Sequence, residues 1–236
     1  MRQEYKIDDK LKAYAEFAED NEHAVQLSFE RSGRIWLASI MDMVMHETTH
    51  TYTHSLENKE SKYLHSRCYI DTHLHDGLRF FDTAKYIFLI RDPRDSFRSW
   101  IEMAIHEGRR GLDIWTDKDV LRWMCHEWMS YFNSGVLDKD TLIVRYEDLC
   151  LRPVQTLEYI TGHIEWIEPA RKIDDVVCVW PDREKGFIEP DVDYYNLHCM
   201  KWKRVFTDGQ SEYIFDLIGD TMFKYGYRRS GYDRHI

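Results

Sequence analysis

Short apolar runs alternate with amphipathic stretches along this chain, and the alternation predicts strands and helices in turn. The clearest apolar run is Y-I-F-L-I at residues 86–90. A run without polar interruptions is typical of a central parallel strand that is covered on both faces. Three further runs predict strands of the same sheet: residues 23–29, 68–70 and 141–144.

Amphipathic stretches between these runs predict helices, and several of them have capping residues at their ends. Pro93 lies near the start of one helix, Asp117 or Asp119 caps another, and Thr207 caps the last, which Gly226 stops. Helices are expected at residues 1–20, 35–46, 74–82, 95–106, from the aspartate cap to 132, at 153–161 and at 207–224.

Strands that alternate with helices define an α/β fold class. We predict a three-layer α/β/α arrangement with a central parallel sheet, in one domain that spans residues 1–236. Residues 48–62 and 180–200 lack a clear period and are expected to be loops. Ligands of such sheets bind beyond the carboxyl ends of the strands. The loops that should meet there are those after residues 29, 71, 91 and 145.

The charge balance narrows the range of partners. A net charge of −10 argues against a nucleic-acid or acidic-membrane binder and favours a neutral or cationic partner.

The five cysteines form no C-x-x-C pair, which favours free thiols in a reducing compartment. Residues 1–20 have no apolar core typical of a signal peptide, and no apolar run reaches the ~20 residues of a membrane span. The expected location is the cytoplasm.

A small-residue turn at Ser32 and Gly33 joins the first predicted strand to the first predicted helix. Such a turn directs backbone N–H groups and a helix N-terminus at an anion. Arg31 and Arg34 flank the turn and add positive charge. The loop is not a Walker A sequence, because G-x-x-x-x-G-K-[ST] is absent. Considered alone, the turn is equally compatible with a purely structural role.

Three further motifs follow in the chain. R-D-P-R-D-S-F-R-S spans residues 91–99 and places Arg91 at the tip of the central strand, where a guanidinium can bind phosphate through two nitrogens. Y-E-D-L occupies residues 146–149, and W-K-R-V-F-T-D-G-Q occupies residues 202–210. Each of these motifs alone is also compatible with a strand exit or a capped helix.

Together the four motifs resemble the sulfotransferases that use 3′-phosphoadenosine 5′-phosphosulfate (PAPS). The loop of that family, P-[KR]-S-G-[TN]-T-W, corresponds here to E-R-S-G-R-I-W at residues 30–36. The family motifs R-x-P-[RK]-D-x-x-x-S, Y-E-D-L and W-K-x-x-F-T-x-x-Q are matched in the same order, so the resemblance covers residues ~24–226. It implies a P-loop-like phosphosulfate-binding loop and transfer of a sulfuryl group to a hydroxyl or amine of a small-molecule acceptor, without a metal.

The resemblance also implies roles for individual residues. Arg31 and the loop amides would hold the 5′-phosphosulfate, Trp36 and Tyr146 would contact adenine, and Arg91 with Ser99 would bind the 3′-phosphate. The full set of cofactor-binding residues is then Arg31, Ser32, Gly33, Arg34, Ile35, Trp36, Arg91, Ser99 and Tyr146.

The catalytic histidine of the family lies in a strand-end motif like K-T-H-L, and D-T-H-L at residues 71–74 occupies that place. His73 is therefore the expected general base, and Arg31 the second catalytic residue. An imidazole suits this task because its unperturbed pKa of ~6.5 lets it accept a proton near neutral pH. A structural histidine at a strand end is the alternative interpretation.

The chain departs from the family pattern at several positions. Glu30 replaces a proline, and Arg34 with Ile35 replaces a threonine pair. The family motif R-K-G before the tryptophan is Y-N-L at residues 195–197. Substitutes for its charges are Lys201, Lys203 and His198.

Two other classes of function are compatible with the sequence. One is a binding or scaffold protein that kept this fold and lost catalysis. The other is a zinc hydrolase, because His46-Glu47-x-x-His50 matches H-E-x-x-H, whose histidines share one helix face. His73-x-His75 similarly matches the H-x-H of metal-dependent hydrolases.

Overall fold

The structure is a computed structural model. It describes residues 22–44, 49–52, 67–72, 84–165, 173, 181–182, 186–187 and 199–232. The helices predicted at 1–20 and 74–82 lie outside the described residues, and so does most of the predicted loop at 180–200.

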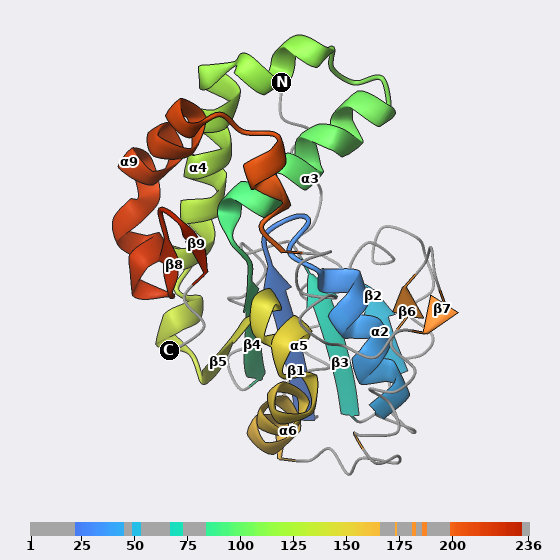
Figure 1. The fold of residues 1–236 in the computed structure, drawn as a ribbon. Helices are drawn as coiled ribbons and strands as arrows, with labels where there is room; N and C mark the ends of the chain where they lie inside the picture. The colour runs from blue at the N-terminus through green and yellow to red at the C-terminus, as the bar shows by residue number, and fades with distance from the viewer. Residues whose placement is uncertain are drawn as a thin grey trace, which may run out of the picture.

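Five parallel strands form the central sheet (Figure 1). In spatial order they are β2 (Thr49–Tyr52), β3 (Arg67–Thr72), β1 (Glu22–Ser28), β4 (Lys85–Ile90) and β5 (Thr141–Arg145). The chain fills the sheet on one side of β1 first and then continues on the other side with β4. The gap between β1 and β4 is therefore the topological switch point, where open α/β sheets bind their ligands.

Helices flank this sheet, which confirms the predicted α/β class. α2 (Arg34–Val44) contacts β1 and β3, whereas α6 (Pro153–Ile164) contacts β4 and β5. The helices α3 (Pro93–His106), α4 (Lys118–Phe132) and α9 (Asp208–Lys224) pack against one another (Figure 1). The described residues also include three 3-10 turns: η4 (Leu112–Thr116) between α3 and α4, η5 (Val136–Asp138) between α4 and β5, and η6 (Lys201–Arg204) before α9.

The helix ends follow the capping chemistry of the sequence. The side chain of Asp117 accepts hydrogen bonds from the first turn of α4, so Asp117 is the cap and Asp119 is not. Thr207 and Gln210 form a reciprocal capping box at the start of α9. Gly226, with φ 87°, follows the end of that helix as predicted.

The structure corrects two sequence predictions. The stretch 48–62 was expected to be a loop, but Thr49–Tyr52 forms the edge strand β2. Its T-H-T-Y sequence has no apolar run because an edge strand needs little burial. No helix was predicted at residues 146–151, but they form a separate helix, α5 (Tyr146–Leu151), and Pro153 then begins α6.

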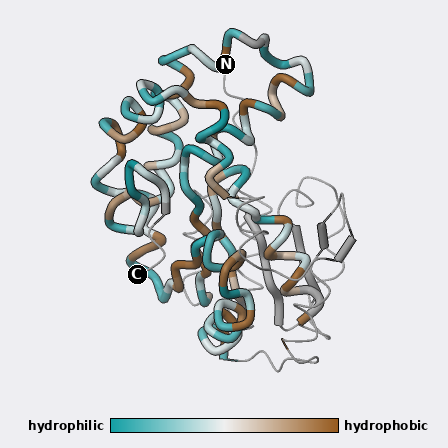
Figure 2. The backbone as a smooth tube through the Cα atoms, in the orientation of Figure 1, coloured by the Kyte–Doolittle hydropathy of each residue, from teal (hydrophilic) through white to brown (hydrophobic). Residues whose placement is uncertain are grey.

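Small paired strands complete the described fold: β6 (Pro181–Asp182) with β7 (Gly186–Phe187), and β8 (Tyr227–Arg228) with β9 (Gly231–Tyr232). Figure 2 shows that hydrophobic and hydrophilic residues alternate along the helices, as amphipathic packing requires. No helix among the described residues is long and apolar enough to cross a bilayer.

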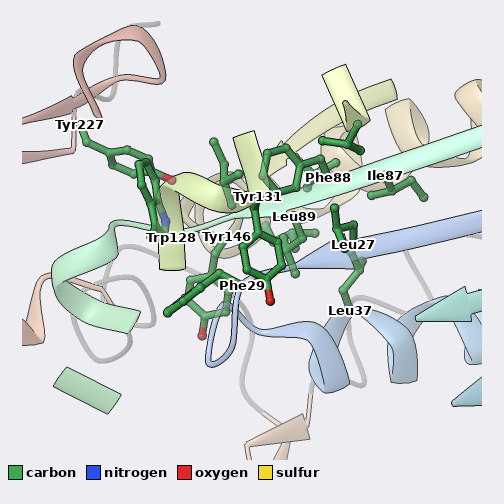
Figure 3. Close-up of a cluster of buried hydrophobic side chains, with 14 of the residues drawn as sticks. Leu27, Phe29, Leu37, Ile87, Phe88, Leu89, Trp128, Tyr131, Tyr146 and Tyr227 are labelled. Carbon is green, nitrogen blue, oxygen red and sulfur yellow. The ribbon is translucent and has the colours of Figure 1, made fainter. Parts of the chain in front are cut away.

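An aromatic cluster joins the sheet to the helical layer (Figure 3). Phe88 of β4 packs edge-on against Phe132 of α4, with ring centroids 5.0 Å apart. Phe29, at the end of β1, contacts both Phe97 of α3 and Tyr131 of α4. Because Phe29 is the last residue before the predicted anion loop, this packing fixes where that loop begins.

Candidate functional site

The loop after β1 has an unusual backbone. Arg31 and Gly33 both have positive φ, at 65° and 92°. The N–H of Ser32 donates to the carbonyl of Phe29 at 3.2 Å and closes the turn. α2 begins directly afterwards at Arg34. The first turn of a helix offers N–H groups that have no acceptor earlier in the helix, so this end of the loop is suited to an anion.

Gly33 is required for the close approach of this loop to α5. A Cβ atom at this position would lie 2.5 Å from Cδ2 of Tyr146, which is too close for any side chain. The positive φ excludes ordinary L-residues independently. The loop after β1 and the start of α5 are therefore in direct contact, as the predicted convergence of strand ends requires.

Two arginines and three serines tie the loop to α3 and to the residues just before it. Arg31 Nε donates to Ser99 Oγ at 3.1 Å, and Arg91 donates to the carbonyl of Arg31 at 3.0 Å. Ser32 Oγ lies 3.4 Å from Ser96 Oγ, one turn before Ser99. Residues about 60 positions apart in the sequence thus form one polar surface beside the switch point.

An aromatic pair lies next to this polar surface. The rings of Trp36 and Tyr146 are 5.1 Å apart between centroids, and the guanidinium of Arg91 stacks 4.3 Å from the centroid of Tyr146. Tyr146 is buried and Trp36 is half-buried. Aromatic faces beside cationic groups suit a ligand that has both a flat ring and phosphates.

The electrostatics of the site favour an anion. Burial alone would lower the pKa of Arg91, but neighbouring acidic groups, among them Asp95, raise it above its ordinary value, so Arg91 stays charged. Desolvation and the charge of Arg91 lower the pKa of Arg31. Two guanidiniums held this close repel each other, and an anion between them would relieve the repulsion.

A buried ion pair supports the start of α3. Asp92 accepts from Arg94 through both carboxylate oxygens, and both side chains are almost completely buried. Arg94 also donates to the carbonyls of Arg228 and Arg229, and it stacks over the ring of Trp202. The segment that carries Arg91 is therefore joined to the C-terminal part of the chain.

Glu147 lies beneath the same segment and is fully enclosed. Its carboxylate accepts from the N–H of Asp92 at 2.9 Å and from the hydroxyl of Tyr227 at 3.0 Å. Burial raises the pKa of Glu147 to about 8. Its position one residue after Tyr146 suggests that it fixes the start of α5, which holds the aromatic side of the site.

The structure brings most of the predicted site residues together. Arg31, Ser32 and Gly33 contact residues of α3 or α5, while Arg34 is buried at the first position of α2. Ile35 exposes 49% of its surface. β3 ends at Thr72, which pairs in register with Leu27, and His73 lies outside the described residues.

Sequence reasoning did not find every residue of this surface. Ser96 contacts the loop serine, and Arg98 forms an ion pair with Glu102 along α3. The signal for Arg98 was its i, i+4 spacing from Glu102, which places both side chains on one face of the helix. Burial of Glu147 could not be seen in the sequence, because a glutamate after a strand is usually solvated.

The zinc interpretation of H-E-x-x-H required one helix through His46 and His50. His50 instead lies in strand β2, so the helical premise is wrong. His46, Glu47, His73 and His75 lie outside the described residues.

These features define a parallel α/β protein with a loop suited to an anion at its switch point. A family model described as the sulfotransferase family matches residues 2–168 of the 236. The match covers well over half of the chain, and the protein therefore belongs to the sulfotransferase family. None of the curated protein sequences matches this chain.

Solved structures of sulfotransferases share the fold at low sequence identity. Mouse sulfotransferase SULT7A1, complexed with PAP, is 16% identical with a TM-score of 0.60, and the alignment covers 92% of this chain and 90% of that one. Retinol dehydratase, in complex with androsterone and the inactive cofactor PAP, is 14% identical with a TM-score of 0.58, covering 90% and 85%. The sulfotransferase domain from the curacin biosynthetic pathway is 14% identical with a TM-score of 0.55, covering 85% and 97%.

Proposed function

We propose that this protein transfers a sulfuryl group from PAPS to a hydroxyl or amine of a small-molecule acceptor and releases PAP. The observation that carries the proposal is the convergence of Arg31, Arg91 and Ser99, from two separate strand ends, on one cationic surface. PAPS supplies an activated sulfuryl group when it is bound. Its phosphates and its adenine match the cationic and aromatic halves of the site.

The residues present fit such a nucleotide. The Gly33 turn keeps the loop free of a side chain where it approaches Tyr146. Arg91 and Ser99 would hold the 3′-phosphate, while Trp36 and Tyr146 would contact the adenine. Arg31 and the amides from Gly33 to Ile35 would hold the 5′-phosphosulfate, because the N–H of Ser32 already closes the turn.

His73 is the proposed general base. It directly follows Thr72 in the sequence, and Thr72 is the last residue of β3, whose carboxyl end lies beside that of β1. A neutral imidazole there would accept the proton of the acceptor hydroxyl or amine. Arg31 would stabilise the negative charge that develops on the oxygens around sulfur, through a cation held in place before the reaction begins.

A neutral or cationic acceptor is the expected partner, because a chain of net charge −10 repels polyanions.

Transfer itself is tested by incubating the protein with PAPS and a panel of phenols, alcohols and amines, with sulfated products detected by mass spectrometry. We expect acceptor-dependent formation of PAP, and loss of turnover with PAP binding retained in His73→Ala.

A catalytically silent nucleotide-binding protein of the same fold is the competing function. The observation in its favour is the exposed Ile35, which stands where the family has a threonine hydroxyl. PAP binding without transfer to any acceptor in the panel would support this alternative. Turnover that survives in His73→Ala would remove His73 from the mechanism but would leave the enzymatic function intact.

A further inference from the structure

The 3-10 turn η6 is held against α3 by one buried carboxylate. Asp95 accepts from the N–H of Met200 at 2.6 Å and from the N–H of Trp202 at 3.0 Å. These two bonds hold the backbone on both sides of Lys201. The position of Lys201 is therefore set by the same helix that carries Ser99, although the two residues are about a hundred positions apart in the sequence.

Lys201 is close enough to the arginines of the site for their charges to act on it. Lys201 is only partly exposed, and its ammonium makes no hydrogen bond or ion pair within the part of the chain that the structure describes. Desolvation and the charges of Arg98 and Arg91 lower the pKa of Lys201. An ammonium near two guanidiniums is unfavourable unless an anion lies between them.

Arg98 adds a further positive charge beside Ser99. Its Nε lies 3.8 Å from a carboxylate oxygen of Asp95, and its NH1 atom donates to Glu102 at 2.5 Å. Nε is buried and donates no hydrogen bond to any described residue, while 9% of the whole residue is exposed. Arg98 thus has donor capacity left over on the side of α3 that carries Asp95.

The contacts connect these groups into one surface. Asp95 joins Lys201 to Arg98, Ser99 follows Arg98 on the next position of α3, and Ser99 accepts from Arg31. Arg91 reaches the carbonyl of Arg31 from the other end. The cations Arg31, Arg91, Arg98 and Lys201 outnumber the carboxylates of Asp95 and Glu102 that pair with Arg98, so this surface favours an anion.

We propose that Arg98 and Lys201 complete the binding site for the 3′-phosphate of the nucleotide, in place of the basic motif missing at residues 195–197. This inference rests on the proposed function. A terminal phosphate carries nearly two negative charges at neutral pH, and charge-assisted hydrogen bonds are the strongest contacts available to it. Neither residue has a fixed identity in the family motifs.

Lys203 is the matched control on the same turn. It is exposed, and its ammonium lies 5.6 Å from the ring of Trp202. The structure thus separates two lysines that the sequence left as equal candidates.

The experiment measures binding of PAP and of adenosine 5′-phosphate, which lacks the 3′-phosphate, by calorimetry. Lys201→Ala and Arg98→Gln should each weaken PAP about tenfold or more and change adenosine 5′-phosphate less than about twofold. Lys203→Ala should leave both affinities within about twofold. Thermal unfolding without ligand checks that each variant is folded.

Equal PAP affinity in the wild type and in folded Lys201→Ala would overturn this inference and leave the proposed function standing. Equal losses for both nucleotides would also overturn it, because the effect would not concern the 3′-phosphate. If the wild-type protein fails to bind PAP at all, both the inference and the proposed function fail.

Discussion

At the scale of single residues, two independent constraints require glycine at position 33. Its φ of 92° excludes side chains for reasons of backbone sterics, and Tyr146 fills the space that a Cβ would need. Gly33→Ala should lower the free energy of unfolding by about 1–3 kcal/mol, measured by denaturant titration, and should weaken PAP binding.

Gly162→Ala is the control for this variant. Gly162 lies inside α6, where a Cβ meets nothing within 4 Å. Alanine has the better helix propensity, so this variant should gain about 0.5–1 kcal/mol. If Gly33→Ala were as stable as Gly162→Ala, the claim that the contact with Tyr146 requires glycine at position 33 would be wrong.

Glu147 predicts a dependence of stability on pH. Its folded-state pKa of about 8 lies above the ordinary value of 4.5, mainly because burial disfavours the charged form. Between these two values the folded state binds more protons than the unfolded state, so stability falls as pH rises, by up to about 1.4 kcal/mol per pH unit.

Glu147→Gln keeps the shape of the side chain and removes this titration. Denaturant titrations of both proteins at pH 5–8 should show a steeper loss of stability in the wild type. Subtracting the two curves cancels the contribution of other groups. A wild-type curve parallel to that of Glu147→Gln would mean that Glu147 is ionised in the folded protein throughout this range.

At the scale of elements, Arg94 joins α3 to the C-terminal strand pair. Arg94 donates to the carbonyl of Arg228, and both Arg94 and its ion-pair partner Asp92 are almost completely buried. Arg94→Ala would therefore leave Asp92 charged and enclosed. We expect a loss of about 3–5 kcal/mol in the free energy of unfolding. The exposed pair of Arg122 with Asp119 is the comparison, and Arg122→Ala should cost less than about 1 kcal/mol.

Elements with a strong local pattern were predictable, and the others depended on tertiary contacts. The apolar run of β4 and the Thr207 cap of α9 indicated their structures directly. β2 was missed because its pairing with β3, and not its own composition, makes it a strand. α5 was missed because a six-residue helix carries too little periodicity to recognise.

At the scale of the whole molecule, the strand order explains why residues distant in the sequence form one site. β1 and β4 are neighbours across the switch point, so the loop at Arg31 meets Arg91, which lies between β4 and α3. The sequence motifs identified these residues by resemblance. The contact of Ser32 with Ser96 and the hydrogen bonds from Met200 and Trp202 to Asp95 could not be predicted, because they arise from packing of the loop and of η6 against α3.

The central claim is that this surface binds the nucleotide of a sulfotransferase, and calorimetric titration with PAP tests it most directly. We predict saturable binding of one PAP per chain, weakened about tenfold or more in Arg91→Ala. Arg91→Lys keeps the charge but loses the planar guanidinium, so its affinity for PAP should lie between those of the wild type and Arg91→Ala. Absence of PAP binding by the wild-type protein, or an unchanged affinity in folded Arg91→Ala, would contradict the account.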